Sequence, residues 1–273
     1  MKNIPMYELT NPQKSIWLME QYFQGTPINN ICGHFIIKQE TDLKLLNTAL
    51  NCFIKNNDSF KLRFALKNGE LFQYFIDDKN YNFEVLNIEN ENQIEVFAKK
   101  EVNTRLDILS SRPFDFKLFK LSSGFGGFII HTHHIISDAA TISILCTEVA
   151  QIYSKLLKNE EIAKKTYSYI DYIASEKEYL KSTRFEKDKT YWNSFLTPLP
   201  EVATFIPSKS ESSDNYKAKR KGFVIDNKFF KKIKEYCLLT NTSVYNFLIG
   251  VYSIYLGRVN NLEEFTIRNT NFK

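Results

Sequence analysis

Apolar residues recur every three or four positions in several stretches of the chain, the spacing that places them on one face of an amphipathic helix. In the clearest case Leu46, Leu50 and Phe53 share a stripe that follows a capping residue, either Thr41 or Asp42. The same spacing, with capping residues where the chain offers them, predicts further helices over 12–23, 91–106, 140–156, 167–180, 184–195, 228–239 and 244–256.

Shorter segments rich in apolar, β-branched and aromatic residues, bounded by turn signals, predict strands. Lys67-Asn68-Gly69 and Ser122-Ser123-Gly124 are two such turns, and the first predicts a hairpin. Helices and strands follow one another without a strict strand-helix-strand rhythm, so the predicted fold class is α/β or α+β with a mixed sheet. The predicted strands are 32–37, 60–66, 71–76, 83–86, 116–121, 127–133, 216–225 and 265–268.

The stretch 128–145 holds three of the four histidines of the chain. An apolar run enters it as a strand, and the alternation of a strand places His131 and His133 on one face and His134 on the other. Asp138 follows His134 by four residues, and a helix is predicted just beyond it. A histidine pair at the end of a strand, with an aspartate in the next turn, is an arrangement suited to catalysis.

Several interpretations of these histidines are open. On a strand they can be purely structural, satisfied residues. A metal site would use His131 and His133 together, but no Cys, Asp or Glu stands at ligand spacing beside them, so no metal is predicted. A Ser-His-Asp triad would need a nucleophile elbow, and the sequence contains no G-x-S-x-G. The last interpretation is acyl transfer in which one histidine acts as a base and no covalent enzyme intermediate forms.

The segment HHIISDA, at His133 to Ala139, resembles the HHxxxDG motif of the condensation domains of nonribosomal peptide synthetases. These domains belong to the chloramphenicol-acetyltransferase-like acyltransferases. Four other stretches are similar to motifs of this family and occur in the family's order, so the resemblance covers nearly the whole chain. They are LTNPQKSIW at 9–17, NNDSFKLRF at 56–64, PFD at 113–115 and RFEKDKTYW at 184–192.

The resemblance implies the chloramphenicol-acetyltransferase-like fold, in which helices pack on a mixed sheet. Residues 1–180 are then expected to form the N-terminal lobe that carries the histidine motif. Residues 181–273 are expected to be a helical linker and the truncated start of the C-terminal lobe, because condensation domains have about twice the usual domain length of ~100–200 residues. The isolated chain is accordingly expected to be inactive, and its uncovered apolar surface would favour self-association.

The resemblance also assigns roles to individual residues. His134 is expected to be the base, or the residue that orients the attacking amine, and His133 to support the site structurally. Asp138 is expected to hold the turn in place by pairing with Lys61 or Arg63. Two positions depart from the family pattern. Ala139 replaces a glycine and adds a methyl group where substrate approaches, and Lys61 replaces an arginine but lacks its bidentate fork.

A role for histidine in amide-bond formation also follows from elementary chemistry, independently of the family resemblance. An amide bond forms when an amine attacks an activated acyl group such as a thioester. An α-amine has a pKa of roughly 7.7–8.0, so near neutral pH it must lose a proton before or during the attack. Histidine side chains ordinarily titrate near pH ~6.5, and one can accept that proton when its free nitrogen lies within hydrogen-bonding distance.

The resemblance further implies partners. The substrates are expected to arrive on the 4′-phosphopantetheine arms of carrier proteins, next to an adenylation domain, in the biosynthesis of a peptide antibiotic or lipopeptide. No tightly bound cofactor is expected. The sequences at 12–14, 25–31 and 184–192 are similar to starter domains, which take a fatty acyl group from a coenzyme A or carrier thioester. Two alternatives stay open: a stand-alone acyltransferase of this fold, and a catalytically impaired interaction domain.

The composition of the chain indicates which kinds of partner it binds and in which cell compartment it is expected. The net charge of +5 comes from scattered rather than clustered side chains, so nucleic-acid binding is not predicted. No run approaches ~18 consecutive apolar residues, so no membrane span is predicted. The four cysteines show no paired spacing, and the N-terminus lacks the pattern of a signal peptide. A cytoplasmic protein with reduced thiols is therefore expected.

Overall fold

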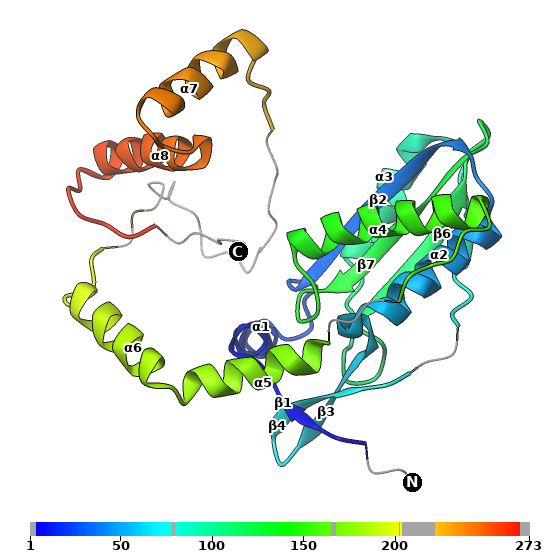
Figure 1. The fold of residues 1–273 in the computed structure, drawn as a ribbon, viewed down its shortest axis with the longest axis horizontal. Helices are drawn as coiled ribbons and strands as arrows, with labels where there is room; N and C mark the ends of the chain where they lie inside the picture. Colours follow the sequence, from blue (N-terminus) through cyan, green and yellow to red (C-terminus); the bar gives the residue numbers. More distant parts are fainter. Residues whose placement is uncertain (1–3, 78–79, 165–167, 202, 204–221, 268–273) are drawn as a thin grey trace. The chain divides into compact units, whose positions relative to one another are not determined.

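The computed structural model describes residues 4–77, 80–164, 168–201, 203 and 222–267. The chain divides into two compact units, Met1–Lys181 and Ser182–Lys273, each of which is described by itself (Figure 1). Within the described residues, no helix combines the length and the apolar character that crossing a membrane requires.

The first unit is built around a four-stranded sheet with β7 (Phe125–His133) and β6 (Phe114–Lys120) at its centre. β2 (Asn30–Glu40) pairs with β7 at one edge, and β5 (Glu84–Asn87) pairs with β6 at the other. The β5–β6 pair is parallel and the other two pairs are antiparallel, so the sheet is mixed, as the sequence predicts. β7 is therefore paired on both sides, and the histidine motif lies at its end.

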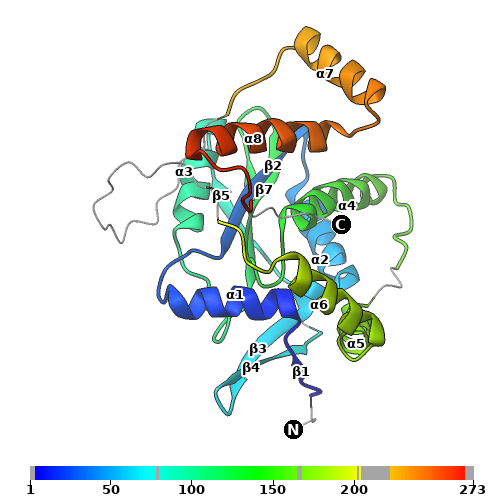
Figure 2. The same cartoon turned by 90° about the vertical axis from the view of Figure 1, so that its left-hand side faces the viewer.

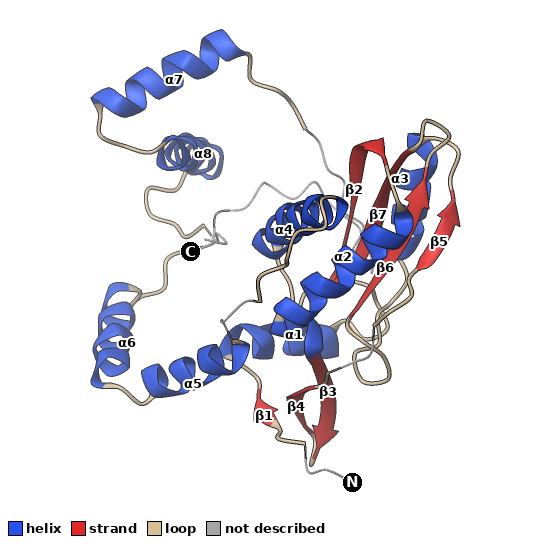
Figure 3. Ribbon diagram, turned by 45° about the vertical axis from the view of Figure 1, so that its right-hand side comes forward, coloured by secondary structure: helices blue, strands red, loops and turns tan. Residues whose placement is uncertain are grey.

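Helices cover both faces of this sheet: α2 (Leu43–Asn56) and α4 (Ala139–Leu157) lie on one face and α3 (Glu91–Val102) on the other (Figures 2 and 3). The side chain of Phe128 belongs to the core cluster that includes residues of α2 and α4. Its neighbour Ile129 belongs to a second cluster that includes residues of α3. This is the strand alternation that the sequence predicts.

A smaller sheet in the same unit has three strands in the order β1–β4–β3. β3 (Leu62–Lys67) and β4 (Glu70–Phe75) form the predicted hairpin, whose turn residues 68–69 both have positive φ. β3 begins two residues later than predicted, because Asp58–Lys61 form a 3₁₀ turn first. β1 (Tyr7–Glu8) adds a short third strand.

Two further helices belong to this unit. α1 (Asn11–Tyr22) starts with a capping box between Thr10 and Gln13. α5 (Tyr169–Leu180) contacts its first turn, where the Glu176 carboxylate accepts the backbone N–H of Asn11 at 3.1 and 3.2 Å. An acidic side chain at this helix start also complements the positive end of the helix dipole.

α3 ends at Val102, four residues before the predicted end. The side chains of Asn103 and Thr104 donate hydrogen bonds to the carbonyl oxygens of Lys99 and Lys100, at 2.6 and 3.0 Å. These side chains satisfy carbonyls of the last turn, and the helix ends there.

The second unit contains α6 (Thr183–Phe195), α7 (Asn227–Leu239) and α8 (Val244–Asn260). Each is preceded by an N-cap side chain that accepts a backbone N–H, and Ser243 is the cap of α8. The predicted strand at 216–225 falls largely outside the described residues. Of the strand predicted at 265–268, the described residues 265–267 form one bridge, in which the backbone of Thr266 bonds to that of Glu201 and Ala203.

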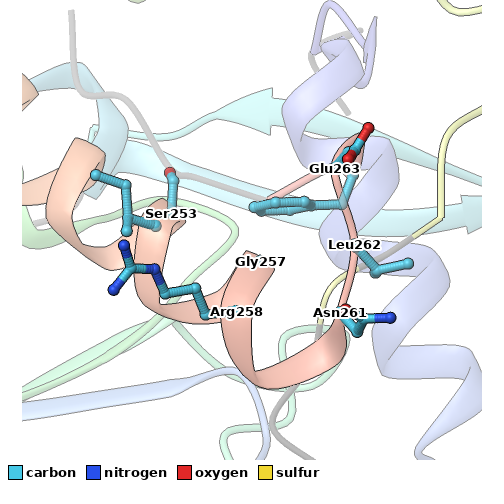
Figure 4. A pocket seen from close by; sticks show the side chains of 8 residues that line it. Ser253, Gly257, Arg258, Asn261, Leu262 and Glu263 are labelled. Atoms are coloured by element: carbon cyan, nitrogen blue, oxygen red, sulfur yellow. The ribbon is translucent and has the colours of Figure 1, made fainter.

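A shallow pocket lies at the end of α8, where the chain reverses (Figure 4). Arg258, Asn261 and Glu263 contribute its polar lining. A Cβ atom at Gly257 would lie 3.0 Å from both the Leu262 oxygen and the Phe265 ring, so glycine permits the close return of the chain.

Gly127 lies near the start of β7, where the sheet leaves no room for a side chain. A Cβ atom there would lie 2.0 Å from the Phe35 backbone oxygen and 2.7 Å from the Phe119 ring. Gly33, on the neighbouring strand β2, offers a contrast, since no heavy atom lies within 4 Å of its Cβ position.

His131 is buried on the α3 face of the sheet, in register with Cys32 and Asp115 on the two neighbouring strands. Its Nδ1 lies 3.6 Å from a Glu101 carboxylate oxygen, and its Nε2 has no hydrogen-bond partner among the described residues. Burial lowers the pKa of His131 from 6.5 to about 4; nearby Asp115 opposes this shift, and Lys117 adds to it. The ring is therefore neutral near pH 7.

We expect Gly127→Ala to lower the free energy of unfolding by roughly 2 kcal/mol or more, because overpacking a filled interior typically costs ~1–3 kcal/mol. Urea unfolding followed by circular dichroism measures this. Gly33→Ala is the matched control on the adjacent strand and should change stability by less than about 1 kcal/mol. Equal losses in the two variants would contradict the described packing.

We also expect stability to fall on acidification through His131. The folded pKa is depressed to about 4, so below about pH 6.5 the unfolded chain takes up a proton that the folded ring does not accept. The loss in the free energy of unfolding grows as the pH falls from about 6.5 to about 4, and it reaches roughly 3 kcal/mol below pH ~4. Urea unfolding at a series of pH values measures it. His131→Gln removes the titrating ring and should flatten this slope. An unaltered slope in His131→Gln would refute the assignment.

Candidate active site

The backbone of the two adjacent histidines is held from both sides at the end of β7. His133 pairs with Asn30 of β2, and its N–H donates to the Pro113 oxygen at 2.9 Å. The N–H of His134, the first residue beyond the strand, donates to the Asn29 oxygen at 2.7 Å. Both imidazole rings are therefore attached to backbone that neighbouring segments hold in place, and neither lies on a free loop.

The His133 side chain is buried and hydrogen-bonded at both ring nitrogens. Nδ1 accepts the backbone N–H of Ile135 at 3.1 Å, which requires an unprotonated Nδ1. The ring proton is then on Nε2, which lies 3.3 Å from a Glu20 carboxylate oxygen. His133 is 1% exposed, so these two contacts occupy both nitrogens and leave neither for a substrate.

The His134 side chain is exposed, and one ring nitrogen is already engaged. Nδ1 lies 2.7 Å from the Ser137 backbone oxygen, which can only accept, so Nδ1 carries a proton. In the neutral ring Nε2 therefore carries the lone pair, and it forms no hydrogen bond within the described residues. A histidine in this tautomer, held at one nitrogen and open at the other, has the geometry of a general base.

Ser137 supports this arrangement, although sequence reasoning did not single it out. Its hydroxyl lies 3.1 Å from the His133 backbone oxygen and 3.1 Å from the Thr132 hydroxyl, and the residue is buried. Its carbonyl is thereby turned toward His134. Small hydroxyl side chains commonly bond to nearby backbone in tight turns, and this is the signal in the sequence that could have identified it.

Asp138 caps helix α4. One of its carboxylate oxygens accepts both the backbone N–H and the hydroxyl of Thr141, each at 2.8 Å. Negative charge at this end of a helix is stabilised by the helix dipole. Asp138 stands four residues after His134, and its carboxylate fixes where α4 begins and thereby holds the turn.

The predicted ion pair between Asp138 and Lys61 or Arg63 is wrong: no such pair occurs in the described part of the chain. Lys61 instead lies 3.1 Å from Asp58 and 3.7 Å from Asp77. Arg63 is buried and donates to the backbone oxygens of Phe60 and Leu62 and, at 2.8 Å, to the Tyr81 hydroxyl. Local acceptors satisfy both cations, and the helix N-terminus satisfies Asp138.

Ala139 is the first residue of α4 and is exposed. Its φ is not positive, so alanine adopts this backbone conformation without strain. The difference from the glycine of the resembling motif is thus confined to one methyl group on the surface of this unit.

No group of three His, Cys, Asp or Glu side chains in the described ranges is arranged to hold a metal ion. His131 and His133 share a face of the strand, but their rings face different carboxylates, Glu101 and Glu20. The two histidines do not converge on one point.

The chain is similar to known proteins over nearly its whole length. The model of the family described as "Condensation domain" matches residues 3–270. Surfactin synthase subunit 1 of Bacillus subtilis (strain 168) is 30% identical over 264 residues, which cover 94% of this chain and 7% of that protein. The chain therefore spans a small fraction of the length of this relative.

Solved structures show the same fold. The first condensation domain of the calcium-dependent antibiotic synthetase, in complex with a substrate analogue, matches with a TM-score of 0.79 and 16% identity over 94% of this chain and 62% of that one. The starter condensation domain of the rhizomide synthetase, in a mutant form bound to C8-CoA, matches with a TM-score of 0.68 and 22% identity over 73% of this chain and 47% of that one. The family match, which extends over nearly the whole sequence, shows that this chain belongs to the condensation domain family of nonribosomal peptide synthetases.

Proposed function

We propose that the chain carries the histidine site of a domain that forms an amide bond between a donor acyl thioester and an aminoacyl group on a carrier protein. The observation that supports this most is the exposed His134 ring, with its proton held at Nδ1 by the Ser137 oxygen and its Nε2 open. Membership of the condensation domain family supports the choice of reaction.

The proposed mechanism needs one proton acceptor. The acceptor amine attacks the thioester carbonyl, and the new C–N bond forms as the amine proton passes to Nε2 of His134. The tetrahedral intermediate then collapses, the C–S bond breaks, and the proton returns to the departing thiolate. His134 is regenerated, and the enzyme forms no covalent intermediate.

The other residues of the motif support this step without touching the reacting atoms. His133 has both nitrogens engaged, so it anchors the loop. Asp138 sets the start of α4. Because the base is fixed by backbone contacts on both sides, little reorganisation is needed when the substrate amine arrives.

The proposed substrates are thioesters of 4′-phosphopantetheine. The acceptor is an aminoacyl group on a carrier protein that an adenylation domain loads, and the donor is a fatty acyl group on coenzyme A or a carrier. A starter condensation domain of the same fold has been crystallised with C8-CoA, and this supports the choice of donor. The relatives named as a surfactin synthase and a calcium-dependent antibiotic synthetase support a role for the product in peptide antibiotic or lipopeptide biosynthesis.

We expect His134→Ala, in the full-length protein that contains this sequence, to reduce the acylation of an aminoacyl-loaded carrier by roughly 100-fold or more, the usual contribution of a general base. Intact-protein mass spectrometry of the carrier measures the added acyl mass. His34→Ala, at an exposed histidine on β2, is the matched control and should keep wild-type activity. Full activity of His134→Ala would remove the catalytic proposal and favour an interaction domain.

We expect the wild-type protein to use an acyl-coenzyme A donor directly. Octanoyl-coenzyme A and an aminoacyl-loaded carrier should yield the N-octanoyl product in the same mass-spectrometric assay. A second reaction offers an aminoacyl donor on an upstream carrier in place of the acyl-coenzyme A. Product only in the second reaction would reject the starter assignment and retain amide formation.

A further inference from the structure

Helix α1 buries polar side chains against the histidine loop, residues 133–137, which comprises the last residue of β7 and the turn that follows it. Its two buried residues are Gln13 and Glu20, which stand seven positions apart and so share a face about two helical turns long. Leu18 and Tyr22, by contrast, are 65% and 81% exposed. Ile16 and Trp17 pack partly against the core, but the most deeply buried contacts of this helix are polar.

α1 lies beside the end of β7 (Figures 1 and 2), and its two buried side chains reach His133 and the turn that follows it. The Gln13 amide donates to the Ile135 oxygen at 3.4 Å and to the Gln73 side chain at 2.8 Å. Glu20 lies 3.3 Å from Nε2 of His133. One helix face thus contacts the histidine loop at two points, and the Glu20 contact carries a charge.

Glu20 accepts hydrogen bonds from three separate segments. One oxygen accepts from Nε and an Nη of Arg105, both at 3.2 Å, and the other accepts from the Asn29 amide at 2.8 Å and from His133. Burial raises the pKa of Glu20, but the hydrogen bonds from His133, Asn29 and Arg105 outweigh it, so the pKa is lowered overall. The group is therefore a buried carboxylate, with Arg105 as its counter-ion.

These contacts connect Glu20 to both histidines. Its carboxylate accepts a hydrogen bond from the Nε2–H group of His133 and so favours the tautomer whose Nδ1 accepts from Ile135. Asn29, whose side chain Glu20 holds, accepts the backbone N–H of His134 through its own carbonyl at 2.7 Å. Glu20 thus acts on the side chain of one histidine and on the backbone of the other.

We propose that Glu20 is the positioning residue of the histidine pair, and that its ion pair with Arg105 keeps His133 in the Nε2-protonated tautomer and His134 in place. These contacts by themselves define the ring and backbone geometry that Glu20 holds. The effect of Glu20 on turnover rests on the function proposed above for His134.

The first experiment needs no substrate. Long-range ¹H–¹⁵N correlation spectra of the ¹⁵N-labelled chain report which ring nitrogen of each histidine is protonated, and amide hydrogen exchange reports the His134 N–H. Glu20→Gln replaces a two-oxygen acceptor with one oxygen and an NH₂ group that faces other donors. We expect changed His133 ring signals and His134 amide exchange faster by roughly 10-fold or more, as for loss of a hydrogen bond to a charged group.

Further variants distinguish positioning from general damage. Glu20→Asp retains the carboxylate and should restore the His133 tautomer in part. Arg105→Gln removes the counter-ion at a side chain that is 42% exposed, so it can be made even if Glu20→Gln fails to fold, and it should shift the same signals. Glu40→Gln removes a carboxylate that pairs with Lys120 at the surface and should leave the histidine signals unchanged.

Unaltered His133 and His134 signals in folded Glu20→Gln, or in Arg105→Gln if the former does not fold, would overturn the proposal. In the full-length protein we expect Glu20→Gln to lower turnover by about 100-fold, the scale of a small misplacement of a catalytic group, with Glu20→Asp intermediate. If His134→Ala keeps full activity, the proposed function fails, while the spectroscopic result on Glu20 still stands or falls by itself.

Discussion

The double pairing of β7 is the constraint on which the rest of the site depends. This strand is bonded to β2 on one side and to β6 on the other, and the pairing with β2 continues to its last residue, His133. A strand held on two sides cannot slip in register without exposing its buried side chains. The glycines at 126 and 127 let the neighbouring strands and side chains approach closely, and this fixes the same register.

The histidine motif uses this rigidity at the point where the strand ends. Beyond His133 the chain turns through 134–137 and enters α4, whose start is fixed by the Asp138 cap. Two anchored elements thus lie on either side of a short turn, and the turn carries one exposed ring with a defined tautomer. Sites built on such elements hold their groups more precisely than sites on free loops.

The buried polar groups around the motif have a cost that the structure offsets with partners. Glu20 is 5% exposed yet is surrounded by donors, and a buried carboxylate without them would be strongly unfavourable. His131 is the contrasting case, because it is held neutral and one ring nitrogen lacks a partner among the described residues. On β7, His133 therefore has a hydrogen-bond partner at both ring nitrogens, whereas His131 has none at Nε2 among the described residues. His134, just past the end of the strand, faces solvent.

Local pattern determined much of this protein. Period-two alternation put His131 and His133 on one face, and apolar spacing located the helices. The capping residues Thr41 and Asp42 marked the start of α2. Each of these signals depends on residues near in sequence. The motif itself identified the family. Tertiary structure alone decided hydrogen-bond partners: Asp138 bonds to its own helix rather than to Lys61 or Arg63, and Glu20 reaches His133 from 113 residues away. Hydrophobic periodicity predicts the face of an element on which a side chain lies. It does not predict which residue, distant in the sequence, will form a hydrogen bond with that side chain.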